Sequence, residues 1–148
     1  MIRGIAAVIV GYIVMSLIVG LGLTGAYIAL GADTAFQPGS WEVSMVWLGV
    51  WFVVGLIAAL IGGWLASKIA AGPGGVRALA VIVLLLGLAL AGAQMVMEKP
   101  APGPRGPDVS SMDAMQKAEQ PPWVAFLTPV IGFLGVSIGG RGAKRKAR

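Results

Sequence analysis

Four long apolar runs constrain this chain more than any other feature, and the only charged side chain in them is Arg3. The runs cover residues 2–30, 43–67, 78–97 and 123–140. A bilayer has a hydrocarbon core about 30 Å thick, which an apolar helix of about 17 to 25 residues can cross. The four runs therefore predict four transmembrane helices.

Composition supports this reading. The chain has 148 residues, of which 57% are hydrophobic and only 11% are charged, whereas about a quarter of the residues in soluble domains are charged. Four spans and their connections use the whole length, so we expect an all-α integral membrane protein with a single membrane domain over residues 1–148. The first run is longer than the apolar core of a signal peptide, which is about 7 to 15 residues, and we read it as an uncleaved anchor.

The connections differ in character. We expect outer loops at 31–42 and 98–122, a cytoplasmic turn at 68–77 and a basic tail at 141–148. Within the long loop, Ser110 and Asp113 form a capping-box pattern, and Asp113 stands four residues before Lys117. We therefore predict a short interfacial helix within residues 108–120. In the fourth run, Pro129 predicts a kink or local unwinding.

Charge predicts the orientation. If the loops alternate between the two sides, eight of the 11 basic residues fall on the side of the termini, and all six acidic residues fall on the other side. The positive-inside rule then predicts an up-down-up-down bundle with both termini in the cytoplasm. In general form the chain resembles small multi-pass proteins of bacterial inner (plasma) membranes, where we place it. The basic tail suits anionic membrane lipids, and we do not expect nucleic acid as a partner.

Several kinds of chemistry lack their usual residues. The chain has no cysteine and no histidine, which removes thiolate nucleophiles, iron–sulfur ligands and the commonest haem and metal ligand. Buried ionisable side chains, which normally mark ion pathways and active sites in membranes, are missing from the interior of the four runs. We therefore expect no catalytic residues, no metal site, no cofactor and no enzymatic activity.

The tryptophans have two expected roles. Trp41, Trp64 and Trp123 fall near the ends of the predicted spans, where aromatic side chains anchor helices at the membrane interface. Trp47 and Trp51 lie deeper and one helical turn apart, so they could contact a lipid, a pigment or a quinone-like ring. A lipid-facing or interhelical aromatic pair is the commoner arrangement, which makes them weak cofactor candidates.

Small residues recur at four-residue spacing and provide the main positive signal. Such faces allow helix backbones to approach closely, either within one chain or between subunits. Internal packing is the more frequent use, because four spans already need such faces. The residues expected in helix packing are Gly55, Ala59, Gly63, Ser67, Gly135 and Gly139.

Two further patterns leave alternatives open. Gln94 and Thr128, with the adjacent Pro129, could form a polar site, although Ser and Thr in such helices usually bond their own backbone. Residues 38–41 and 121–123 precede the second and fourth runs with similar Pro and Trp residues, which a parallel duplication of the two halves would explain.

These observations favour a non-catalytic accessory subunit that packs through small-residue faces, against itself or within a larger membrane complex. The alternative is a small carrier or channel-like protein for a neutral or lipidic solute, using Gln94 and Thr128.

Overall fold

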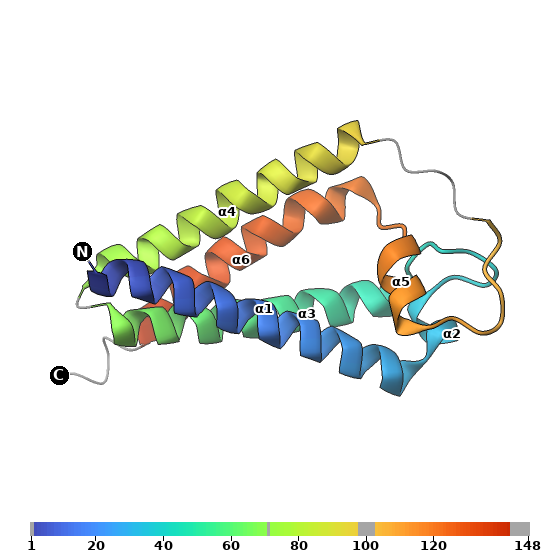
Figure 1. The fold of residues 1–148 in the computed structure, drawn as a ribbon, viewed down its shortest axis with the longest axis horizontal. Coiled ribbons are helices and arrows are strands. Elements are labelled where there is room, and N and C mark those ends of the chain that lie inside the picture. Colours follow the sequence, from blue (N-terminus) through green and yellow to red (C-terminus); the bar gives the residue numbers. More distant parts are fainter. Residues whose placement is uncertain (1, 71, 98–102, 143–148) are drawn as a thin grey trace.

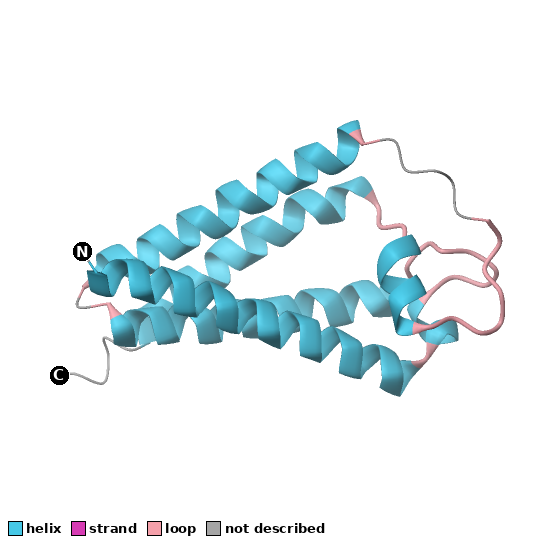
Figure 2. Ribbon diagram, viewed as in Figure 1, coloured by secondary structure: helices cyan, strands magenta, loops and turns pink. Residues whose placement is uncertain are grey.

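The computed structural model describes residues 2–70, 72–97 and 103–142. The chain is all-helical, with four long apolar helices and two short helices in the connections between them (Figures 1 and 2). The long helices are α1 (Ile2–Leu30), α3 (Met45–Ile69), α4 (Pro73–Val96) and α6 (Pro122–Gly142). The short helices are α2 (Ala32–Ala35) and α5 (Ser111–Lys117). The prediction of four apolar helices is therefore confirmed.

Most of the apolar surface of the long helices faces outward. In the most apolar stretch of each helix, the buried share runs from 11% in α1 to 33% in α6. Large side chains such as Leu17 and Val53 are more than half exposed. Water would solvate such a surface poorly, whereas lipid tails solvate it well. Each long helix is also long enough to span a bilayer, which supports a multi-pass membrane protein.

Two helix starts follow from local capping. α3 begins at Met45 because the Ser44 hydroxyl accepts a hydrogen bond from the Trp47 amide at 3.1 Å. α4 begins at Pro73 rather than at residue 78, because proline is tolerated in the first turn of a helix, where its missing N–H has no intrahelical partner. The connection between α3 and α4 is therefore shorter than the predicted turn at 68–77.

α6 remains helical through Pro129, so the predicted local unwinding is absent. The proline ring packs against α4 at Gly87, where an added Cβ would lie 2.6 Å from Pro129 Cγ. The missing side chain at Gly87 thus makes room for the ring in the interface between α4 and α6.

The long helices pack in the order α1, α3, α6, α4. α3 packs along both α1 and α6, and α6 packs along α4. α1 and α4 approach closely near one end of the molecule, where Gly75 lies beside Ala7 and Leu79 packs against Gly11. From there the two helices diverge toward the other end (Figure 1). α1 and α4 therefore do not pack along their whole length, and we call the side of the bundle between them the open side.

The two ends of the molecule differ in charge. Ile2, the connection between α3 and α4, and the last turn of α6 lie at one end (Figure 1). We call this the basic end, because it carries Arg3, Lys68, Arg77 and Arg141. α2, α5 and the connecting residues 36–44, 103–110 and 118–121 lie at the opposite end and form what we call the cap.

The backbones of the two long connections pair directly within the cap. The Val43 amide donates to the Glu119 carbonyl at 3.1 Å, and the Glu119 amide donates to the Trp41 carbonyl at 2.9 Å. A buried apolar cluster lies beneath this pairing and draws on α1, α2, α3, α5 and α6 as well as the connections. It comprises Tyr27, Ala35, Phe36, Trp41, Val43, Trp47, Leu48, Ala114 and Val124.

Three polar contacts fasten the segment before α5 to the rest of the cap. Trp41 Nε1 donates to the Gly103 carbonyl at 2.8 Å, and the Tyr27 hydroxyl donates to the Val109 carbonyl at 3.0 Å. The Arg105 guanidinium lies over the Phe36 ring and bonds the Asp33 carboxylate at 3.2 Å. The Arg105 side chain is only 6% exposed.

The capping pattern predicted for the outer loop is present in α5. The Ser110 hydroxyl caps the helix by accepting from the Asp113 amide at 3.1 Å, and Lys117 pairs with Asp113 at 3.3 Å. The Ser110 hydroxyl and the Lys117 ammonium together hold the pKa of Asp113 below its usual range. The helix is shorter than the predicted segment of 108–120.

Trp41 corrects one expectation. Its side chain is 7% exposed and packs edge-on against Phe36 inside the cap, so it does not anchor the chain in lipid. Trp64 and Trp123 are about half exposed at opposite ends of the bundle, as interfacial anchors would be.

Candidate functional site

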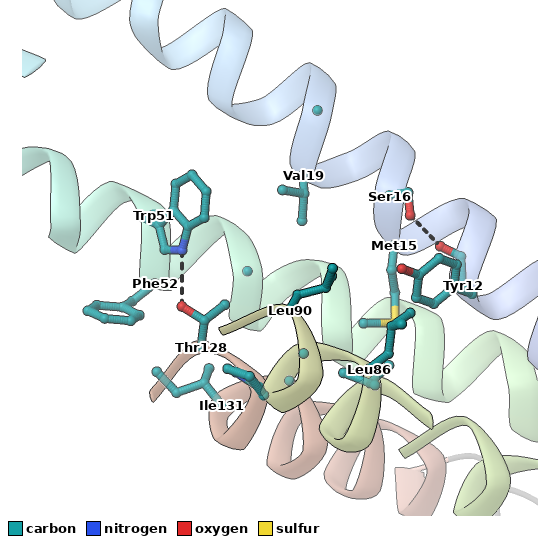
Figure 3. Close-up of a pocket in the computed structure, with 16 residues that line it drawn as sticks. Tyr12, Met15, Ser16, Val19, Trp51, Phe52, Leu86, Leu90, Thr128 and Ile131 are labelled. Atoms are coloured by element: carbon teal, nitrogen blue, oxygen red, sulfur yellow. Dashed lines mark hydrogen bonds between the residues drawn. The ribbon is translucent and has the colours of Figure 1, made fainter. Parts of the chain in front are cut away.

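A cavity of about 420 Å³ lies on the open side of the bundle and is lined by all four long helices (Figure 3). Its volume falls in the range of about 300 to 1,000 Å³ that is typical of small-molecule sites. α1 and α3 contribute Tyr12, Met15, Ser16, Val19, Gly20, Trp51, Phe52 and Gly55. α4 and α6 contribute Val83, Leu86, Gly87, Leu90, Thr128, Pro129, Ile131 and Gly132. We call this cavity the groove.

Two glycines leave space in the groove. An added Cβ at Gly20 of α1 or at Gly55 of α3 would meet nothing within 4 Å. A Cβ at either position would therefore point into open space. The groove is only partly enclosed, and α1 and α4, which both line it, diverge toward the cap (Figure 1).

Three of the polar side chains in the groove already have partners. Trp51 Nε1 donates to Thr128 Oγ1 at 3.3 Å, and the Thr128 hydroxyl donates to the Val124 carbonyl at 2.8 Å (Figure 3). The Ser16 hydroxyl donates to the Tyr12 carbonyl at 3.0 Å. These groups make few demands on a ligand, and the remaining lining is almost entirely apolar.

The two deep tryptophans have different environments. Trp47 is 8% exposed and packs edge-on against Tyr27, with ring centroids 6.0 Å apart, so it belongs to the core of the cap. Trp51 lies against the groove and bonds Thr128. Of this pair, only Trp51 is placed to contact a molecule held in the groove.

The two residues predicted to form a polar site do not lie together. Thr128 lines the groove, whereas Gln94 is exposed on α4 and is not part of the lining. Tyr12 and Gly20 were not predicted as site residues, yet they line the groove and follow with Ser16 a four-residue spacing along one face of α1. That spacing is the signal in the sequence that could have identified them.

The predicted packing residues divide into two groups. A Cβ at Gly63 would strike the backbone carbonyl of Val136, and one at Gly139 would strike the backbone carbonyl of Leu60. Gly135 lies against Ala59, where an added Cβ would be 2.5 Å from the Ala59 Cβ. These residues form a close interface between α3 and α6, which we call the seam.

Gly55 and Ser67 belong, with Ala59 and Gly63, to one stripe of small residues along α3, but they have different surroundings. Gly55 faces the groove, and the Ser67 hydroxyl bonds the Trp64 carbonyl at 2.6 Å in its own helix. The middle of the stripe therefore packs against α6 in the seam, and its end nearer the cap lines the groove.

Within residues 2–70, 72–97 and 103–142, no three His, Cys, Asp or Glu side chains gather as a metal site would require. The chain matches no protein-family model, no curated protein and no solved structure. Its function is therefore argued from the geometry of the groove, the seam and the cap.

Proposed function

We propose that this chain is a non-catalytic membrane protein that binds an apolar molecule of the bilayer in the groove. The observation that carries the proposal is a cavity lined by all four long helices, with glycines leaving space in its walls and an opening between α1 and α4.

The chemistry of the lining selects an apolar ligand. A polar or charged molecule would lose its hydration on entering and would find few free partners, since the groups of Ser16, Trp51 and Thr128 are paired within the protein. An apolar molecule has no hydration to lose when it passes from the lipid phase into this groove. It would make dispersion contacts with the apolar side chains that line the groove and with the Trp51 ring.

The proposal includes an orientation. Arg3, Lys68, Arg77 and Arg141 gather at the basic end, whereas the acidic residues that the structure describes lie in the cap. Under the positive-inside rule this distribution supports a cytoplasmic basic end and an up-down-up-down bundle in a bacterial inner membrane. Membrane lipids are then the immediate partners, and the groove opens into the hydrocarbon region.

The structure bears differently on the two functions expected from the sequence. The role of accessory subunit stays a prediction, but Gly63, Gly135 and Gly139 are used in the seam and no longer argue for an outside partner. The carrier hypothesis predicted a path for a neutral or lipidic solute at Gln94 and Thr128, and of these two residues Thr128 lines the groove. Movement of that solute across the membrane stays a prediction.

Filling the groove should prevent binding. In Gly55→Leu the new side chain would project into open space within the groove, so the fold should survive while the ligand is excluded. The probe is a fatty acid with a photoactivatable diazirine on its chain, incorporated with the protein in liposomes. We expect labelling of Met15 and Leu86, which line the groove, to fall at least about fivefold, which corresponds to a loss of about 1 kcal/mol of binding free energy.

Gly49→Leu is the matched control for this experiment. Gly49 is also on α3 and also has nothing within 4 Å of an added Cβ, but it does not line the groove. Labelling of Met15 should be unchanged in this variant, and labelling of the lipid-facing Leu17 should be unchanged in both. Equal labelling of Met15 in Gly55→Leu and Gly49→Leu would refute the groove as a binding site.

A further inference from the structure

The Tyr12 hydroxyl is the exception among the polar groups of the groove. Ser16, Trp51 and Thr128 all donate hydrogen bonds within the protein, whereas the Tyr12 hydroxyl has no hydrogen-bond partner in the part of the chain that the structure describes. In Figure 3 this hydroxyl points past Met15 toward the other lining side chains. The groove thus contains one free donor.

The depth of Tyr12 makes this free donor informative. A helix rises 1.5 Å per residue, so Tyr12 lies about 15 Å along α1 from Ile2, well inside a hydrocarbon core about 30 Å thick. Lipid tails offer no acceptor at that depth, and an unpaired hydroxyl in an apolar medium is unfavourable. A ligand that brings an oxygen to Tyr12 would satisfy it.

The groove also indicates how such a ligand would lie. Tyr12 and Met15 line one part of it, and Trp51 and Thr128 line another, nearer the cap (Figure 3). Gly20 and Gly55 leave open space in the walls. A molecule with its oxygen at Tyr12 would therefore place its apolar body along these glycines and against the Trp51 ring.

We propose that the ligand of the groove is an apolar molecule with an acceptor oxygen, such as a ketone, a quinone or a long-chain alcohol, which accepts a hydrogen bond from the Tyr12 hydroxyl. This proposal rests on the proposed function, because it names the chemical class that the groove selects. A phospholipid would fit the groove less well, because its oxygens stay at the membrane surface and only its acyl chains reach the depth of Tyr12.

The test compares two probes that differ only in the oxygen. One is a long-chain methyl ketone with an isotope label at its carbonyl carbon, and the other is an alkane of equal length, each added to the full chain in lipid nanodiscs. Loss of one hydrogen bond in Tyr12→Phe should weaken ketone binding about 2- to 10-fold and leave alkane binding unchanged. The infrared carbonyl stretch of the bound ketone should also move to the higher frequency of a carbonyl without a hydrogen bond.

Two control variants make the outcomes distinct. Thr24→Val removes a hydroxyl from the same helix at a position that does not line the groove, so ketone binding and carbonyl frequency should match the wild type. Gly55→Leu should abolish binding of both probes. If Tyr12→Phe retains the wild-type ketone affinity and frequency while Gly55→Leu loses binding, the role of Tyr12 is overturned and the groove stands. If Gly55→Leu still binds both probes, the groove itself is refuted.

Discussion

Replacing Gly63 by leucine should prevent the four helices from assembling. The first atom of the new side chain would strike the backbone carbonyl of Val136 in α6, and a backbone atom cannot move aside without separating the helices. Because close approach of backbones holds membrane helices together, the loss should be far larger than that caused by Leu60→Ala, which only removes bulk from a half-buried position. Thermal melts in mild detergent, followed by circular dichroism and size-exclusion chromatography, measure the difference.

Gly55→Leu is the informative control for this prediction. It adds the same side chain to the same stripe of α3, but at a position where an added Cβ meets nothing within 4 Å. Gly55→Leu should therefore melt near the wild type, whereas Gly63→Leu and Gly139→Leu should both fail to give a folded protein. Comparable melting of Gly63→Leu and Leu60→Ala would show that the seam does not hold α3 against α6.

Replacing Trp41 by alanine should open the cap. The substitution removes a buried ring, its hydrogen bond to the Gly103 carbonyl and its packing against Phe36. Truncation of a buried tryptophan costs about 3 to 5 kcal/mol, and if the cap opens locally this raises the open population at least about 100-fold. Trypsin reports the change at Arg105, whose side chain is 6% exposed in the closed cap.

The rate of cleavage after Arg105 should therefore rise steeply in Trp41→Ala under conditions where cleavage follows the open population. Trp64→Ala serves as the control, because Trp64 is half exposed at the basic end and has no contact with the cap cluster. Its cleavage rate should match that of the wild type. If Arg105 is cut as fast in the wild type as in Trp41→Ala, the two connections do not form a closed cap.

Local signals account for the parts of the fold that the sequence predicted. The four spans depend on length and hydropathy, which each segment carries by itself. α5 depends on Ser110, Asp113 and Lys117, which lie within one or two turns of each other. α4 begins before the predicted span at residue 78, because proline is tolerated in the first turn of a helix, although the glycines beside Pro73 favour a turn.

The cap and the groove depend instead on contacts between distant segments. Trp41 lies at a predicted helix end, where an interfacial anchor is expected. Its burial depends on distant parts of the chain, such as Gly103, which lies 62 positions away and accepts its hydrogen bond. Likewise, Gly55 and Gly63 share one stripe, yet α6 covers only the second. The placement of α6 against α3 determines which glycine packs and which leaves space, and no local pattern encodes it.

The open side between α1 and α4 is the central claim, and distances between spin labels in lipid nanodiscs test it most directly. The absence of native cysteine allows paired labels to be placed through Ile5→Cys with Ala78→Cys near the basic end, and Ile28→Cys with Met95→Cys near the cap. All four side chains are exposed in the structure. Pulsed electron paramagnetic resonance should give a clearly longer distance for the pair near the cap than for the pair near the basic end. Equal distances at the two ends would mean that α1 and α4 pack side by side along their length, and the groove would then not exist.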